Sequence, residues 1–429
     1  MEYLLTGQAA GGIGGVSERR MTHRIIISLC LAALASAAAA QAPTLPPAAV
    51  PPTGTPRAVV SRVVDFPSRI LGETRRLLVS LPRGYDRSTE AYPVLYLMDG
   101  AQQIEMVGTL ARALADQGAV MPEIIVVGIA NTHRERDMTY DKDASVGGLI
   151  PDAGGAPAFV RMIREEIVPL VEKSFRTAPF RILHGHSLGG YVAARTFLND
   201  PRAFDAYIVV SPSLQMEEFR WLDGLERKLG EGDNARTFFQ MSVGNEADPG
   251  PEDGWKPYDE AWRKFAAALR AAPKPHYAWD ARRHPEDNHG SIPIISTYEA
   301  LRAIFAEFSF DDVHHRDMDT VTLAQCRDYY EKLSRQYGFK VEIPLSTIYA
   351  VGQAALRQGP LETAAAFIDE QIRLRPGAPF LYLLKAAERQ ARQDMAGAMG
   401  LIKTARDMAT PDERVSIDSI VRQALTPKK

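Results

Sequence analysis

The stretch Phe180-Arg-Ile-Leu-His-Gly-His-Ser-Leu-Gly-Gly-Tyr191 joins an apolar strand to the start of a helix. Its centre is Gly185-His186-Ser187-Leu188-Gly189, and residues 188–199 have helical spacing. A serine on a sharp strand-to-helix turn projects its hydroxyl out of the sheet, and this turn needs small neighbours, which the two flanking glycines provide. The pattern predicts Ser187 as a nucleophile; the alternative is a glycine-rich connection that only packs closely.

The composition indicates a globular protein of two or three domains. The 429 residues are 45% hydrophobic and 24% charged, with a formal net charge of -3, which is ordinary for a soluble chain. There is no overall basic excess, so nucleic acid is not an expected partner. Of the two cysteines, Cys30 falls in the export signal described next, and this leaves Cys326 without an intramolecular disulfide partner.

The N-terminal residues indicate export. Residues 21–40 combine a short basic start, an apolar run over 25–37 and small residues at the end, the pattern of a secretory signal peptide. Residues 1–20 are interpreted as an upstream mis-start, and the Pro- and Ala-rich residues 41–57 as a disordered linker. The apolar run is too short to span a bilayer comfortably. We therefore expect a periplasmic or secreted protein without a membrane anchor.

Residues 58–310 alternate between strand and helix patterns. The first two expected strands alternate apolar and polar residues, as antiparallel edge strands do, whereas the later ones are continuous apolar runs typical of buried parallel strands. The polar, Trp-bearing residues 216–234 interrupt this order and are interpreted as an insertion that shapes a pocket or lid. The prediction is a mostly parallel, doubly wound α/β sheet, with strands at 58–66, 75–81, 93–97, 123–128, 180–187, 206–210, 237–243 and 276–280.

Residues 311–429 show helical patterns only. A linker helix is expected over 323–336. Beyond it, Pro376 and Pro411 are 35 residues apart, and Ala364 and Ala398 are 34 residues apart, which is the period of tetratricopeptide-like helix pairs. About two such pairs are too few to stand alone, so we expect them to pack on the preceding domain, self-associate or bind a protein partner.

A nucleophilic serine needs a histidine base, and the base needs a carboxylate. After a strand-turn-helix serine the expected chain order is serine, acid, histidine. His289 lies between the last expected strand and helix of this domain, and it is the predicted base. His284 is its main rival; the other histidines considered begin a strand or flank the serine too closely, namely His276, His184 and His186.

The acid is expected just after the strand at 237–243. Gly244-Asn-Glu-Ala-Asp248 offers two carboxylates there, Glu246 and Asp248, and the residues alone leave the choice open. Either could instead be a solvated loop carboxylate or a turn cap.

Two further groups are expected around the serine. The amide of Leu188, with that of Gly100 or Ala101 after the strand at 93–97, is predicted to form an oxyanion hole. Asp99 is expected to stabilise that turn.

Arg134 and Arg136 follow another central strand, at the sheet edge where ligands bind. They could clamp an anionic or carbonyl-rich substrate, or pair with Asp137 and Glu135. No metal or other cofactor is expected, because residues such as His314-His315 lack metal-ligand spacing.

Five ordered motifs resemble the putative-esterase family of α/β-hydrolases, which includes enterochelin-esterase-like periplasmic hydrolases, S-formylglutathione hydrolases and mycolyl transferases. The resemblance spans about residues 58–308. A subgroup of that family fuses the hydrolase to tetratricopeptide-like repeats, and Tyr329-Tyr-Glu-Lys-Leu-Ser334 with Tyr337-Gly338 is similar to its extension. The motifs are Tyr96-Leu-Met-Asp-Gly100, Asn131-Thr-His-Arg-Glu-Arg-Asp137, Gly185-His-Ser-Leu-Gly-Gly190, Ser211-Pro-Ser-Leu214 and His289-Gly-Ser-Ile-Pro293.

The resemblance implies catalytic roles for Ser187 and His289, and it favours Glu246 because relatives often carry Gly-Asn-Glu there. The chain departs from the family pattern at Gln215, where a tryptophan is common, and at His133, where an acidic residue is expected. The leading interpretation is an exported, cofactor-free serine esterase that forms an acyl-enzyme from siderophore-type or other small esters. The alternatives are an acyltransferase using the same acyl-enzyme, and a repeat-based binding scaffold with a vestigial hydrolase domain.

Overall fold

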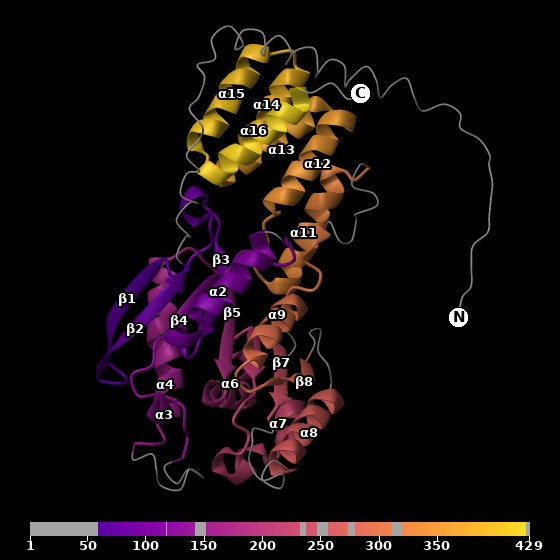
Figure 1. Ribbon diagram of the computed structural model, residues 1–429. Helices are drawn as coiled ribbons and strands as arrows, with labels where there is room; N and C mark the ends of the chain where they lie inside the picture. Colours follow the sequence, from indigo (N-terminus) through magenta and orange to yellow (C-terminus); the bar gives the residue numbers. More distant parts are fainter. Residues whose placement is uncertain are drawn as a thin grey trace, which may run out of the picture. The chain divides into compact units, whose positions relative to one another are not determined.

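The computed structural model describes residues 59–116, 118–141, 152–231, 237–246, 256–272, 279–310 and 320–425 (Figure 1). Within these residues the chain forms two compact units, one ending at Gly377 and the other beginning at Ala378. The predicted signal peptide and linker lie outside the described residues, as do Asp248, His276 and His314-His315.

One eight-stranded sheet organises the first unit, in the order β1-β2-β4-β3-β5-β6-β7-β8. β1 and β2 are antiparallel to each other, and β2 is antiparallel to β4. All other neighbours are parallel. The predicted mostly parallel α/β fold is therefore confirmed, although β2 lies inside the sheet rather than at its edge. The strands are β1 (Arg62–Ser68), β2 (Glu73–Ser80), β3 (Tyr92–Leu97), β4 (Ile125–Ile129), β5 (Thr177–His186), β6 (Ala206–Val210), β7 (Phe238–Asn245) and β8 (Trp279–Asn288).

Burial explains the two kinds of strand pattern. Every residue of β3, β4 and β6 is buried, because helices cover both faces of the central sheet and favour continuous apolar runs there. β8 is polar along most of its length and pairs only with β7. An edge strand tolerates such residues, including Pro285. This is why the apolar pattern predicted only its first residues and missed its extension to Asn288.

Helices follow the strands on both faces of the sheet (Figure 1). On one face α2 contacts α9, and on the other α6 contacts both α4 and α7, which in turn contacts α8. The first unit also contains the π-helical turn η2 (Ile163–Ile167) and the short 3-10 segments η1 (Tyr85–Arg87), η3 (Pro201–Ala203) and η4 (Met216–Leu222). Its helices up to residue 310 are α2 (Gly100–Asp116), α3 (Arg134–Asp137), α4 (Ala156–Met162), α5 (Val168–Ser174), α6 (Leu188–Asn199), α7 (Leu225–Glu231), α8 (Lys256–Ala271) and α9 (Ile292–Ile304).

Three more helices belong to the same compact unit. They are α11 (Leu323–Tyr337), α12 (Leu345–Gln358) and α13 (Leu361–Leu374). On β5, Phe180 contacts the rings of Tyr337 and Phe339, with centroids 6.0 and 5.6 Å away. Buried Arg375, just after α13, forms an ion pair with buried Glu90 near the start of β3. These contacts join the helices to the sheet.

The second unit contains α14 (Pro379–Ala391), α15 (Met395–Met408) and α16 (Pro411–Leu425). Helices α12 and α14 begin at Leu345 and Pro379, 34 residues apart, and α13 and α15 begin at Leu361 and Met395, also 34 residues apart. The C-terminal helical region is thus present, and its tetratricopeptide-like nature stays a prediction. Among the described helices, none is both long enough and apolar enough to cross a bilayer.

Candidate active site

Ser187 stands between β5 and α6 with its backbone in the left-handed region, at φ 59° and ψ −120°. A non-glycine residue keeps this conformation only where its surroundings hold it. Its amide donates to the carbonyl of Val210 at 3.0 Å, and its carbonyl accepts from the amides of Tyr191 and Ser213 at 2.9 and 3.0 Å. The turn is thus bonded to its own helix and to the end of β6.

The two glycines beside the serine are not equally constrained. A Cβ atom on Gly185 would lie 2.1 Å from the carbonyl oxygen of Gly189, which no side chain can do without displacing backbone. On Gly189 the nearest atom would be Cβ of Met98, at 3.3 Å. Of the two glycines that flank the serine, Gly185 therefore has the stricter space requirement.

Glu246 and His289 come together although 43 residues separate them in sequence. His289 Nδ1 lies 2.8 Å from Glu246 Oε2. The carboxylate is 8% exposed and the imidazole 43% exposed. Because an ionised carboxylate only accepts hydrogen bonds, Nδ1 carries the proton, and Nε2 keeps a lone pair that can accept one. This is the tautomer that a general base requires.

Buried donors hold the other oxygen of Glu246. Ser211 Oγ donates to Oε1 at 2.5 Å, and the amide of Gly244 donates to the same atom at 3.2 Å. Burial opposes the negative charge, but the hydrogen bonds from His289 and Ser211 outweigh it and lower the pKa of Glu246 below its ordinary value. Ser211 was not predicted as a site residue; its place at the start of the Ser-Pro-Ser-Leu motif is the signal that could have found it.

His289 also contacts the residue before the serine. His186 Nε2 donates to the carbonyl of His289 at 2.8 Å, and the two rings lie 4.6 Å apart between centroids. Burial and the neighbouring His289 lower the pKa of His186 to about 4, so its ring is neutral near pH 7. Within the described residues no hydrogen bond joins Ser187 Oγ to His289; such bonds often tighten only when substrate binds.

The rival histidines have other partners. His184 is fully buried with Nε2 2.8 Å from Thr297 Oγ1, and burial lowers its pKa to about 3. His284 lies in β8 with Nε2 3.4 Å from Glu299 Oε2. Neither hydrogen-bonds to Glu246.

The expected oxyanion-hole amides lie at two neighbouring helix starts. Gly100 and Ala101 open α2, and Leu188 opens α6. The preceding strands β3 and β5 are paired, with Leu97 opposite His184. First-turn amides have no acceptor within their own helix, and the helix dipole places positive charge there. The structure therefore brings these three residues to one edge of the sheet.

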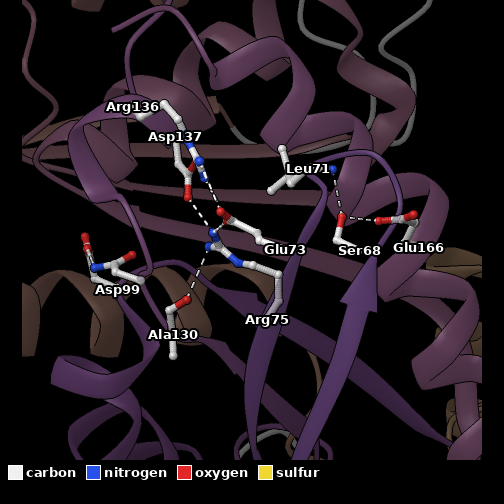
Figure 2. Close-up of polar contacts among 10 residues, drawn as sticks. Ser68, Leu71, Glu73, Arg75, Asp99, Ala130, Arg136, Asp137 and Glu166 are labelled. Atoms are coloured by element: carbon white, nitrogen blue, oxygen red, sulfur yellow. Dashed lines mark hydrogen bonds and ion pairs between the residues drawn. The ribbon is translucent and has the colours of Figure 1, made fainter. Parts of the chain in front are cut away.

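The two candidate substrate-binding arginines are both paired with carboxylates. Arg134 contacts both oxygens of Asp99, at 2.6 and 3.0 Å. Arg136 contacts Glu73 at 2.7 Å and Asp137 at 2.6 Å, in the network that Figure 2 shows around buried Arg75. Of the two alternatives from the sequence, pairing is what these contacts show, although Asp99 and Glu73 were not among the expected partners.

The segment η4, part of the predicted insertion, is attached to α6. Glu217 accepts hydrogen bonds from Tyr191 Oη and, at 2.5 Å, from Arg195 Nη1. Of the two departures from the family pattern, Gln215 precedes η4 and His133 precedes α3, and both are exposed. In the part of the chain that the structure describes, no group of three or more His, Cys, Asp or Glu side chains could hold a metal ion.

Comparison with known proteins relates part of the chain to esterases. Residues 68–277 match the family model "Esterase: Putative esterase". The chain is 34% identical over 143 residues to the ferri-bacillibactin esterase BesA of Bacillus subtilis (strain 168), covering 29% of this chain and 48% of that protein. It is 29% identical over 147 residues to the siderophore enterobactin esterase of Emericella nidulans, covering 30% and 48%. The chain thus spans about half the length of these curated relatives.

A solved structure is similar over a longer range. The crystal structure of an IroE-like serine hydrolase from Shewanella oneidensis has 28% sequence identity and a TM-score of 0.59, and the match covers 77% of this chain and 99% of that one. These matches support an esterase of the α/β-hydrolase class. The matched family region includes Ser187 and Glu246 but ends before His289, which only the folded structure brings to Glu246.

Proposed function

We propose that this protein is an exported serine hydrolase that cleaves carboxylic esters through an acyl-enzyme on Ser187, with His289 as base and Glu246 as the acid that orients it. The observation that carries the proposal is the 2.8 Å contact between Glu246 and the Nδ1 atom of His289, beside a serine at φ 59°. The bond leaves Nε2 able to take a proton next to the strained turn.

The first half of the proposed reaction forms the acyl-enzyme. Ser187 Oγ attacks the ester carbonyl carbon while His289 Nε2 takes its proton, and the carbonyl oxygen becomes an oxyanion stabilised by the amides of Leu188 and of Gly100 or Ala101. His289 then gives the proton to the leaving alcohol oxygen as the C–O bond breaks. Glu246 stabilises the imidazolium between the two transfers.

The second half returns the free enzyme. A water molecule attacks the acyl carbon while His289 Nε2 takes its proton, and the collapse of the oxyanion expels Ser187 Oγ, which recovers a proton from His289. If an alcohol or amine attacked instead of water, the same residues would carry out acyl transfer. Addition of an acceptor alcohol during turnover distinguishes the two, because transfer yields a new ester at the expense of free acid.

Siderophore esters are the substrate class we propose first. Both curated relatives are named as esterases of siderophores, ferri-bacillibactin in one case and enterobactin in the other. The predicted signal peptide at residues 21–40 supports a proposal of periplasmic or secreted localisation. Release of hydroxy acid from a purified cyclic trilactone siderophore, with and without iron, would test the substrate, and p-nitrophenyl butyrate provides a general ester for comparison.

The mechanism is tested by a fluorophosphonate probe, which reacts only with an activated serine. We expect the wild-type protein to be labelled, with the modified peptide containing Ser187, and the Ser187→Ala and His289→Ala variants to be unlabelled but folded. His284→Ala is the matched control, and it should label like the wild type. Absence of labelling in folded wild-type protein, or labelling that needs His284 instead, would contradict the assignment.

A further inference from the structure

Asp99 has an unusual backbone and an ordered position. It follows β3 with φ 54°, in the left-handed region, and it is buried. Its carbonyl accepts hydrogen bonds from the amides of Gln102 and Gln103 at 3.0 and 3.2 Å, which begins α2. The direction of the Gly100 and Ala101 amides therefore depends on how this residue is held, because a strained conformation persists only where other contacts determine it.

Three donors hold the Asp99 carboxylate. Asn131 Nδ2 and Arg134 Nε donate to Oδ1, each at 2.6 Å, and Arg134 Nη2 donates to Oδ2 at 3.0 Å. The paired geometry fixes both the orientation of the carboxylate and its charge balance. The hydrogen bond with Asp99 raises the pKa of Arg134 above its already high ordinary value, so the guanidinium stays charged.

The same carboxylate lies beside the helix that follows the serine. A Cβ atom placed on Gly189 would be 3.5 Å from Asp99 Oδ2. The amide of Leu188, one residue earlier, is a proposed donor to the oxyanion. An uncompensated carboxylate at this place would repel the negative charge that develops in the reaction, and the effect would be strong because the site is partly buried.

Ion pairs join the helix that carries Arg134 to the sheet. Arg134 begins α3, whose last residue Asp137 accepts from buried Arg75 at 2.7 Å, and Arg136 binds Glu73 on β2 (Figure 2). This ion-pair network joins α3 to the sheet. Among the described residues, no hydrogen bond or ion pair joins this network to the Ser187 side chain, so we expect any effect of the network on the reaction to pass through α3 and Arg134.

We propose that Asp99 is a positioning residue for the oxyanion-hole amides of Gly100 and Ala101, and that Arg134 acts by holding and neutralising Asp99 rather than by clamping substrate. The inference rests on the proposed serine mechanism and deepens it. It differs from the substrate-clamp interpretation in what it predicts: loss of Arg134 lowers kcat and leaves KM nearly unchanged.

The test is a double-mutant cycle on purified full-length protein with p-nitrophenyl butyrate. We expect Arg134→Gln to lower kcat about 100-fold with KM within about 3-fold, because it uncovers the Asp99 charge. Asp99→Asn should lower kcat about 10-fold, since it weakens the hydrogen bonds from Asn131 and Arg134 without leaving an unpaired negative charge at residue 99. The double variant should also lose about 10-fold, far less than the product of the two single effects.

The matched control is a second paired arginine and aspartate. Arg76 on β2 donates to both oxygens of Asp65 on β1, at 2.7 and 2.9 Å, and both side chains are exposed. The cycle of Arg76→Gln with Asp65→Asn should leave kcat unchanged. Arg134→Lys, which keeps the charge but not the two-point contact, should lose less than Arg134→Gln, and it serves as the readout if Arg134→Gln does not fold.

The possible outcomes separate this inference from the proposed function. If the wild type labels at Ser187 and hydrolyses the ester, then additive losses in the cycle, or a raised KM at constant kcat in Arg134→Gln, would overturn the positioning role alone. A wild type that folds but neither labels nor hydrolyses would overturn both proposals.

Discussion

Two of the buried carboxylates in this protein, Asp137 and Glu246, have partners of different kinds. Asp137 is 1% exposed and binds two guanidinium groups, those of Arg75, which is 0% exposed, and Arg136, which is 25% exposed. Glu246 is 8% exposed but binds His289, which is 43% exposed. A carboxylate between guanidinium groups, which only donate hydrogen bonds, is suited to holding the fold together, whereas one that orients an accessible imidazole is suited to proton transfer. The difference teaches that the chemical kind of the partner and its exposure, more than the burial of the acid, mark the candidate site.

The largest expected effect that sharpens this comparison is on Glu246. In Glu246→Gln the amide cannot stabilise an imidazolium on His289, and we expect kcat to fall about 10⁴-fold, as when a triad carboxylate is replaced by its amide. Steady-state hydrolysis of p-nitrophenyl butyrate measures the loss. Asp248→Asn is the paired variant; a loss of this size there, and not at Glu246, would make Asp248 the acid.

Asp137 should show the opposite behaviour. Asp137→Asn leaves Arg75 partly unpaired in the interior, and we expect the free energy of unfolding to fall by about 3 kcal/mol, as for a broken buried ion pair. Urea denaturation followed by circular dichroism measures it. The kcat of the folded variant should change far less than in Glu246→Gln. Equal losses of kcat in the two variants would remove the distinction between the arginine-paired and the histidine-paired carboxylate.

A smaller effect is expected at Ser211, which donates a hydrogen bond to the Glu246 oxygen that does not contact His289. Ser211→Ala removes the 2.5 Å hydrogen bond to Oε1, and we expect kcat to fall about 10-fold because the lost bond is charge-assisted. Ser242→Ala is the matched control, since Ser242 Oγ is also buried but bonds to Ser296 at 2.6 Å. A loss in the control as large as in Ser211→Ala would show that packing, and not the hold on Glu246, matters.

The smallest expected effect concerns His184, a buried histidine that is not open to solvent. Its pKa is lowered from 6.5 to about 3, so between these values the unfolded chain binds a proton there that the folded chain does not. Unfolding free energy should therefore rise with pH across this window. We expect this residue to make the wild type about 1 kcal/mol less stable at pH 5.5 than at pH 7.5, and His184→Gln to remove that difference in urea denaturation. An unchanged pH dependence in the variant would contradict it.

Local patterns predicted most of the fold. The apolar runs that became β3, β4 and β6 were recognisable because strands covered on both faces need nothing but apolar residues. The serine turn was recognisable because its steric demand excludes a side chain at Gly185, and Ser187 does adopt the left-handed conformation. His289 was singled out from chain order and Glu246 was favoured over Asp248 by the family resemblance, and the structure places Glu246 and His289 in contact; their catalytic roles stay predictions.

Long-range partners were not predictable in the same way. The bond between Ser211 and Glu246, and the pairing of Arg134 with Asp99 across 35 residues, depend on which strand ends become neighbours. The same holds for Arg375 and Glu90, which are 285 residues apart in sequence. No local periodicity encodes such partners, because each side chain alone would be equally suited to solvent.

By itself the sequence determined most of the secondary-structure order and the class of fold, since these follow from steric and hydrophobic rules that act over a few residues, and it supplied candidates for the three side chains of the proposed triad. Only the tertiary structure decided which side chains become hydrogen-bond and ion-pair partners. It directed Arg134 to Asp99 rather than leaving it free for substrate, and it set Glu246 between Ser211 and His289. The physical reason is that a buried charge is tolerated only where its partners are complete, and completeness is a property of the assembled sheet edge.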